Sequence, residues 1–161
     1  MDFSTFFQYP DSAGSAESKE LVFLPDCNEA DLAKLLAYTE TVRFRAGDVV
    51  MRLGEADRSL YIVTGGRFEV FVPDARGRQA KALATIEEGS VIGEVAFFDA
   101  RPRSASVRAV TDGEMLRLSF EMFEVLAAKE AALGRAILLD LGRILARRLR
   151  QTNALAAEWV S

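Results

Sequence analysis

One stretch of the sequence, Gly89 to Ala109, gathers residue types that could hold a small charged ligand. Glu94 directly follows Gly93, and an isolated carboxylate can accept hydrogen bonds from hydroxyl groups. Arg103, ten residues after Gly93, carries a planar guanidinium that matches the oxygens of a phosphate. Gly89 and Gly93 permit backbone conformations that a side chain would block, and they let the chain approach a ligand closely. The stretch therefore predicts a pocket with an acid at one end and a base at the other.

The residues between the acid and the base leave room for about one helical turn. Val95 to Ala100 can form that turn before Pro102, whose ring disfavours helix in the residue ahead of it. The free N–H groups at the start of such a turn attract anions. A ligand with a ribose at one end and a phosphate at the other fits this arrangement. A surface salt bridge between Glu94 and Arg103 would explain neither the glycines nor the proline.

The same stretch, GEVAFFDARPRSASVRA, resembles the phosphate-binding cassette of cyclic-nucleotide-binding domains. Such domains occur in catabolite activator proteins, regulatory subunits of protein kinase A and cyclic-nucleotide-gated channels. The family pattern is G-E-x-A, a short helix, then P-R-x-A-[ST]. Its positions are filled here by Gly93, Glu94, Ala96, Pro102, Arg103, Ala105 and Ser106. Upstream, FRAGDVVMRLGEADRSLYIVTGGRFEVFV resembles the strand-and-glycine frame of the family, so the resemblance covers about Val42 to Leu126.

The resemblance implies a role for each residue of the predicted site. Glu94 is expected to accept from the ribose 2′-OH and Arg103 to bind the cyclic phosphate, with the backbone N–H groups of the cassette completing the anion site. The expected ligand-binding residues are Gly93, Glu94, Val95, Ala96, Arg103, Ser104, Ala105, Val70, Leu83 and Arg143. Val70 and Leu83 would face the purine. Arg143 lies nearest to the base-capping position of the family, and Arg147 is the fallback.

The resemblance also implies the ligand. Ser104, the small residue after the cassette arginine, permits cAMP and does not exclude cGMP, so cAMP is the expected ligand and cGMP a possible one. No metal cofactor is expected. The chain contains no histidine, which removes the usual ligands of cupin metal sites, the usual axial ligand of haem and the commonest general base. An enzyme on a cupin-like jelly roll is therefore disfavoured, and we expect a binding protein without catalytic activity.

The composition predicts a globular cytoplasmic protein. The 161 residues are 50% hydrophobic and 27% charged, and no apolar run is long enough to span a membrane. The N-terminus lacks the pattern of a secretory signal, and the single cysteine, Cys27, suits a reducing compartment. Cys27 precedes a predicted helix start that could activate its thiol, but no partner base is visible. The net charge of −4 argues against nucleic acid as the main partner.

The order of predicted elements gives a mainly β fold with flanking helices. Residues 1–20 form an aromatic and polar tail, and Asn28 can cap an N-terminal helix whose apolar face would contain Leu32, Leu35 and Leu36. From Thr41 on, alternating residues broken by glycines indicate short antiparallel strands, with a hairpin tip at Asp74 to Gly77. We therefore expect an antiparallel β-roll or jelly-roll barrel over residues 21–128.

The C-terminal part is predicted to be helical. Ser119 can begin a short helix that packs Phe123 and Leu126 inward. Residues 129–161 are expected to form a lid helix, in which one stripe collects the residues Ile137, Leu138, Leu141, Ile144, Leu145, Leu149 and Thr152. The basic run Arg147 to Arg150 could contact an acidic partner or nucleic acid, but a solvated helix face is the expected interpretation. The chain then ends where catabolite activators continue into a DNA-reading segment, so no DNA-binding domain is expected, nor kinase or channel segments.

Two functions remain open at this point. The first is a stand-alone cyclic-nucleotide sensor that signals to an unidentified protein effector by movement of the C-terminal helix. The second is a ligand-blind relative that serves as an interaction or dimerisation module. Either could form a homodimer through the C-terminal helix. The intact cassette favours the first.

Overall fold

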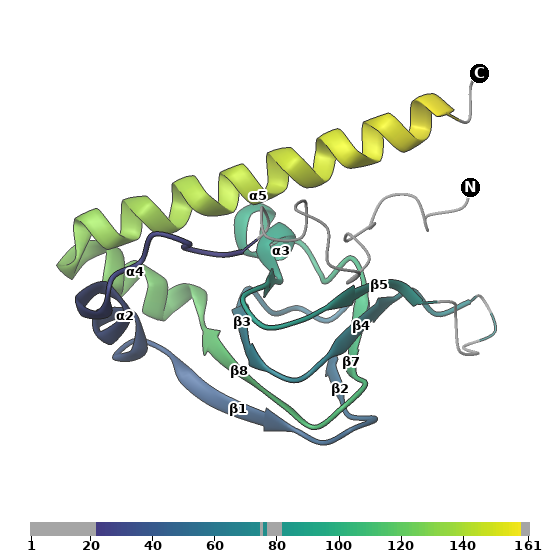
Figure 1. The fold of residues 1–161 in the computed structure, drawn as a ribbon, viewed down its shortest axis with the longest axis horizontal. Coiled ribbons are helices and arrows are strands. Elements are labelled where there is room, and N and C mark those ends of the chain that lie inside the picture. The colour runs from purple at the N-terminus through teal and green to yellow at the C-terminus, as the bar shows by residue number, and fades with distance from the viewer. Residues whose placement is uncertain (1–21, 75, 77–81, 159–161) are drawn as a thin grey trace.

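The computed structural model describes residues 22–74, 76 and 82–158. Within them, two four-stranded antiparallel sheets form a roll, and helices lie beside it (Figure 1). The predicted antiparallel roll with flanking helices is confirmed, with two sheets in place of a closed barrel. The aromatic tail predicted over residues 1–20 lies outside the described residues.

Each sheet combines strands from distant parts of the sequence. The first has the order β1 (Glu40–Phe44), β8 (Gly113–Leu118), β3 (Leu60–Gly65) and β6 (Val91–Ile92). The second has the order β2 (Val49–Met51), β7 (Ser106–Ala109), β4 (Phe68–Phe71) and β5 (Ala82–Ile86). β4 and β5 pair as the predicted hairpin, although most of its tip lies outside the described residues.

The first sheet is covered on both faces. Along β3, Leu60 and Ile62 belong to the apolar cluster shared with the helices, whereas Tyr61 and Val63 belong to the cluster between the sheets. This alternation follows from the two-residue period of a strand. Strand β3 therefore separates two parts of the core, one under the helices and one inside the roll.

Helix α2 (Glu29–Leu36) begins where the sequence predicts, because the Asn28 side chain accepts a hydrogen bond of 2.8 Å from the Asp31 N–H. The predicted apolar face is wrong in part. Leu35 is buried, but Leu32 and Leu36 are 45% and 46% exposed. The helix lies at the edge of the fold and reaches the core through one residue of its narrow inward face.

The last two helices are α4 (Phe120–Lys129) and α5 (Ala131–Glu158). Ser119 caps α4, and both Phe123 and Leu126 point inward as predicted. On α5, Ile137, Leu141 and Ile144 are fully buried, while two leucines of the predicted stripe, Leu138 and Leu149, are 40% and 62% exposed.

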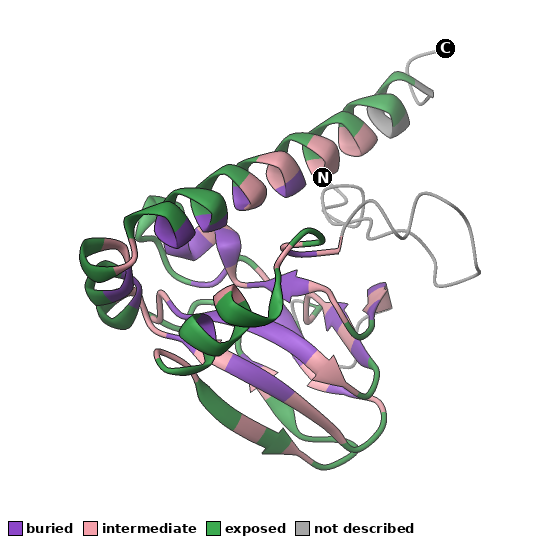
Figure 2. Cartoon of the chain, turned by 60° about the vertical axis from the view of Figure 1, so that its left-hand side comes forward, coloured by how far each residue is buried: buried purple, intermediate pink, exposed green. Residues whose placement is uncertain are grey.

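The two halves of α5 have different surroundings. Its first half is part of the core, and its second half crosses above α3 (Glu94–Asp99) and extends beyond the sheets (Figures 1 and 2). Detachment of the whole helix would expose the core, so the first half cannot leave the sheets without loss of stability. None of the helices in the described residues is long and apolar enough to span a bilayer.

We predict that Ile137→Ala lowers the free energy of unfolding by about 2–5 kcal/mol, because it opens a cavity in a fully buried site. The neighbouring Leu138→Ala is the matched control and should cost about 1 kcal/mol or less. Urea unfolding followed by circular dichroism measures both. Similar losses for the two variants would show that the first half of α5 is not packed as the structure has it.

Candidate functional site

A small pocket lies where β6 passes into α3. Its lining is Met51, Val70, Ile92, Gly93, Glu94, Val95, Ala96, Arg103, Ser104, Ala105 and Val107. The structure therefore brings together all the predicted site residues except Leu83 and Arg143. Met51, Ile92 and Val107 add apolar wall that the sequence analysis did not identify.

Gly93 fits its position because it has no side chain. Its φ of 88° lies in the left-handed region, and an added Cβ would stand 2.5 Å from Arg103 Nη1 and 2.6 Å from the Ser59 carbonyl oxygen. Both separations are shorter than any ordinary contact. A larger residue here would have to displace the arginine, so Gly93 and Arg103 form one unit.

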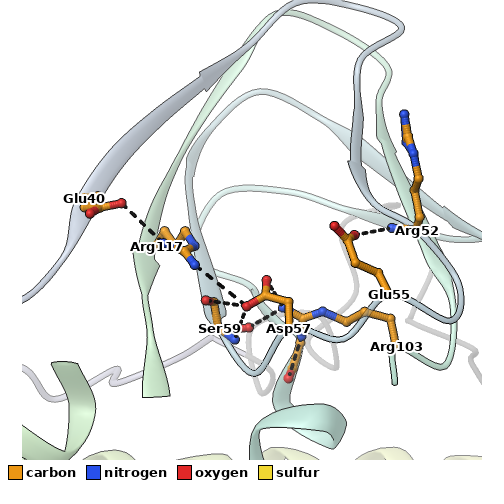
Figure 3. A network of polar contacts seen from close by, with 8 residues as sticks. Glu40, Arg52, Glu55, Asp57, Ser59, Arg103 and Arg117 are labelled. Atoms are coloured by element: carbon orange, nitrogen blue, oxygen red, sulfur yellow. Dashed lines mark hydrogen bonds and ion pairs between the residues drawn. The ribbon is translucent and has the colours of Figure 1, made fainter. Parts of the chain in front are cut away.

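The guanidinium of Arg103 donates hydrogen bonds to three acceptors (Figure 3). Nη2 donates to Asp57 Oδ2 at 2.8 Å and to the Ser59 carbonyl at 2.7 Å, and Nη1 donates to the Gly93 carbonyl at 3.2 Å. Asp57 also lies 3.8 Å from Arg117, which approaches Glu40 on β1. Burial opposes ionisation of Asp57, but hydrogen bonds from Ser59 and Arg103 outweigh it and keep the pKa of Asp57 below its usual range.

One nitrogen of this guanidinium, Nε, is not satisfied. Arg103 is only 3% exposed, and its Nε is buried without a hydrogen-bond partner among the described residues. A buried donor without a partner costs free energy, which a negatively charged ligand would recover. Because Arg103 lines the pocket, its guanidinium can serve as the anion-binding end of the site.

The two carboxylate oxygens of Glu94, at the start of α3, have different surroundings. Its Oε1 accepts from Arg148 Nη1 of α5, whose Nη2 donates to the Val91 carbonyl at 3.0 Å. Glu94 is 3% exposed and lines the pocket, and its Oε2 has no hydrogen-bond partner among the described residues. One oxygen therefore holds α5, and the other is available to a hydroxyl group of a ligand.

The sequence prediction for Arg143 is not met in this structure. Its Nε donates to Asp140 at 2.7 Å and its Nη2 to the Val22 carbonyl at 2.8 Å, away from the pocket. The residue that reaches the cassette is Arg148, five positions later and about 140° further around the helix. Leu83 lies in β5 beside the bulge between β4 and β5 and does not line the pocket.

Helix α3 also contacts α4. The ring of Phe97 packs against Phe120 and Phe123 of α4, with centroids 5.2 and 5.1 Å apart. Arg58 donates to the Phe97 carbonyl at 2.8 Å and stacks on the Phe120 ring. A shift of α3 would therefore be felt by α4 as well as by α5.

The pocket is small, and the groups nearby that could take part in metal or thiol chemistry are few among the described residues. The pocket measures about 40 Å³, far less than the roughly 300–1,000 Å³ of a drug-sized ligand site, so it can enclose one end of a ligand only. Burial, followed by the charge of Asp31, raises the pKa of the Cys27 thiol, which is the opposite of activation. Within the described ranges, no group of three or more side chains is arranged to hold a metal ion.

Comparisons with known proteins found a matching family model and several relatives. The family model described as "Cyclic nucleotide-binding domain" matches residues 41–130. The cyclic AMP receptor protein of Thermus thermophilus is 32% identical over 125 residues, 78% of this chain and 55% of that protein. The cGMP-dependent protein kinase of Plasmodium berghei is 33% identical over 88 residues, 55% of this chain and 10% of that protein.

A solved structure, the catabolite activator protein of Thermus thermophilus, superimposes with a TM-score of 0.74 at 26% identity. The match covers 84% of this chain and 62% of that one. The chain thus spans between a tenth and about half of the length of the two curated relatives.

We predict that Asp57→Asn lowers the free energy of unfolding by about 1–3 kcal/mol at pH 7, because Arg103 loses its charged partner. The pKa of Asp57 is lower in the folded state than its ordinary value of 3.8, so the stabilisation is complete above that value and disappears as the pH falls through the folded pKa. The difference between wild type and variant should therefore shrink below about pH 4.

Urea titrations at several pH values measure this difference. Glu124→Gln, which neutralises an exposed acid on α4, is the control and should show no such pH dependence. A difference that stays constant down to pH 3 would mean that the charge of Asp57 does not stabilise the fold.

Proposed function

Because the chain belongs to the cyclic nucleotide-binding domain family, we propose that the pocket at α3 binds a 3′,5′-cyclic purine nucleotide, with cAMP preferred to cGMP. The cyclic phosphate lies against Arg103, and the ribose 2′-OH donates to Glu94. The backbone N–H groups of Ala96, Ser104 and Ala105, all of which line the pocket, complete the anion site.

The observation that carries this proposal is the unsatisfied Nε of Arg103. A guanidinium that is 3% exposed, fixed through its Nη atoms and without a partner at Nε, is positioned for an anion before the anion arrives. Such preorganisation means that binding costs little rearrangement of the protein. The free oxygen of Glu94 supplies the second fixed point of the ligand.

The small volume of the pocket supports a binding mode in which only one end of the ligand is enclosed. The phosphate and part of the sugar occupy the pocket, and the purine extends beyond it beside the partly exposed apolar residues Val95 and Ala105. Burying one face of an aromatic base against apolar side chains is favourable. Ser104 at the rim is exposed, so the preference for cAMP rests on the family resemblance and on a small side chain at that position.

The same site offers a route for a signal. Glu94 holds Arg148 with one oxygen and the ribose with the other, so ligand binding and the docking of the second half of α5 stabilise each other. The protein thereby acts as a sensor that binds its ligand without turnover, and an unidentified protein effector responds to the state of α5.

We predict that calorimetric titration detects binding of cAMP, and weaker binding of cGMP, without added metal. Arg103→Lys keeps the charge but loses the planar fork, and should weaken cAMP binding about tenfold or more. Arg101→Lys, an exposed arginine of the same segment, is the matched control and should bind as the wild type does. If millimolar cAMP and cGMP produce neither heat nor a thermal shift, the sensor proposal is wrong and a ligand-blind interaction module becomes the better explanation.

We predict that Arg148→Gln weakens cAMP binding by about tenfold and 2′-deoxy-cAMP binding much less, because Glu94 loses the partner that orients it. In the wild type, ligand should slow hydrogen exchange in residues 145–158, and the variant should lack that protection. Arg150→Gln, an exposed change two residues along the same helix, is the control. Equal losses for the two nucleotides would show that Arg148 does not act through the 2′-OH contact.

A further inference from the structure

Asp140 and Arg143, near the middle of α5, form hydrogen bonds with the backbone of residues 22–24, near the N-terminal end of the chain. Asp140 Oδ2 accepts from the Leu24 N–H at 2.6 Å, and Oδ1 accepts from Arg143 Nε at 2.7 Å. Arg143 Nη2 donates to the Val22 carbonyl at 2.8 Å. The Asp140 side chain is 12% exposed, so these are sheltered, charge-assisted hydrogen bonds of the stronger kind.

This stretch, residues 22–24, is fixed to the roll on its other side. The Phe23 N–H donates to the Gly89 carbonyl at 2.9 Å, and the Phe23 side chain is 7% exposed within the core under the helices. Val22 packs on Gly89, 3.5 Å from the position that a Cβ would take there. Residues 22–24 therefore connect α5 to the turn that leads into β6, and we name this connection the latch.

Helix α5 is thus fastened at two points, by the latch and by Arg148 on Glu94. The points are five to eight residues apart, or roughly 8–12 Å along the helix axis. A continuous helix over this span is stiff, so its axial position and rotation at the latch determine where the Arg148 guanidinium lies. A loosened latch would let Arg148 leave the Glu94 carboxylate.

We propose that Asp140 and Arg143 are positioning residues for nucleotide binding. They hold α5 in the place from which Arg148 fixes Glu94, and so keep the second Glu94 oxygen directed at the ribose. The inference rests on the proposed function for the role of Glu94, but the latch itself is a property of the protein without ligand. By linkage, nucleotide binding tightens the latch as much as the latch favours nucleotide binding.

The chain carries a natural reporter beside the latch. A groove of about 460 Å³ lies between the N-terminal stretch and α5, lined by Cys27, Leu133 and Leu139 among others, and by Asp140 and Arg143 themselves. Cys27 is the only cysteine of the chain and is partly buried. Because Cys27 lines the same groove as Asp140 and Arg143, a difference in its rate of alkylation by iodoacetamide between variants reports a change in how residues 22–27 lie against α5, with no nucleotide present.

The test variant is Asp140→Asn, which keeps the size of the side chain and replaces one acceptor oxygen by an amide group that only donates. Alkylation of Cys27 in the absence of ligand should become about three- to tenfold faster. The affinity for cAMP should fall by a similar factor, and the affinity for 2′-deoxy-cAMP much less, because the effect passes through Glu94. Glu124→Gln, the same chemical change on an exposed site of α4, should alter none of these quantities.

A double-mutant cycle separates positioning from general destabilisation. In an Arg148→Gln background, Asp140→Asn should still accelerate alkylation but should cause no further loss of cAMP affinity, because the path to Glu94 is already broken. Arg143→Gln, which removes the bond to Val22 and keeps Asp140, is the second variant if Asp140→Asn fails to fold. It should show the same pattern with smaller changes.

Several results would overturn the inference. An unchanged alkylation rate shows that the latch does not hold the N-terminal stretch. Equal losses for the two nucleotides, or an undiminished loss in the Arg148→Gln background, show that Asp140 acts on the whole fold. Absence of any nucleotide binding by the wild type removes the proposed function along with the positioning role, whereas failure of the inference alone leaves cAMP binding that ignores Asp140→Asn.

Discussion

The structure depends on keeping one guanidinium, that of Arg103, almost completely out of water. A buried charge is tolerated only where hydrogen-bond partners surround it, and two separate segments supply three such partners. Asp57 and Ser59 come from the approach to β3, and the third partner is the carbonyl of Gly93. Since a Cβ at Gly93 would collide with the guanidinium, the start of α3 is fixed by the same requirement.

This constraint explains why the pocket is small and why the Arg103 guanidinium has a fixed position in it. Both Nη atoms of the arginine have acceptors, Nε has none among the described residues, and the residue lines the pocket. In a site that excludes water, a contact between this guanidinium and an anion is stronger than the same contact at the surface. Asp57, which bonds Arg103, also forms an ion pair with Arg117, and Arg117 forms another with Glu40 on β1 (Figure 3).

The two halves of helix α5 are held to the rest of the protein in different ways. Ile137 and Ile144 lie in the core under the first sheet, so the first half cannot leave without loss of stability. Beyond Ile144 the helix is attached mainly through polar contacts, of which the Arg148 pair with Glu94 is the most buried. Polar contacts of this kind exchange one partner for another more readily than a packed core rearranges, which is compatible with the role proposed for the second half of α5.

The sequence by itself determined what is local: the cassette from Gly93 to Arg103, the caps at Asn28 and Ser119, and the antiparallel roll with flanking helices. Their residue types and spacing act within a few positions of one another, so a linear pattern contains the information. Only the tertiary structure decided that Asp57 supports Arg103 and that Arg148, not Arg143, reaches Glu94, because these partners are 46 and 54 residues apart. Helical spacing predicts which residues share a face, but the direction of that face depends on how α5 packs against α3 and α4. A five-residue difference turns a side chain by about 140°, and no pattern within the helix could have fixed that angle relative to the pocket.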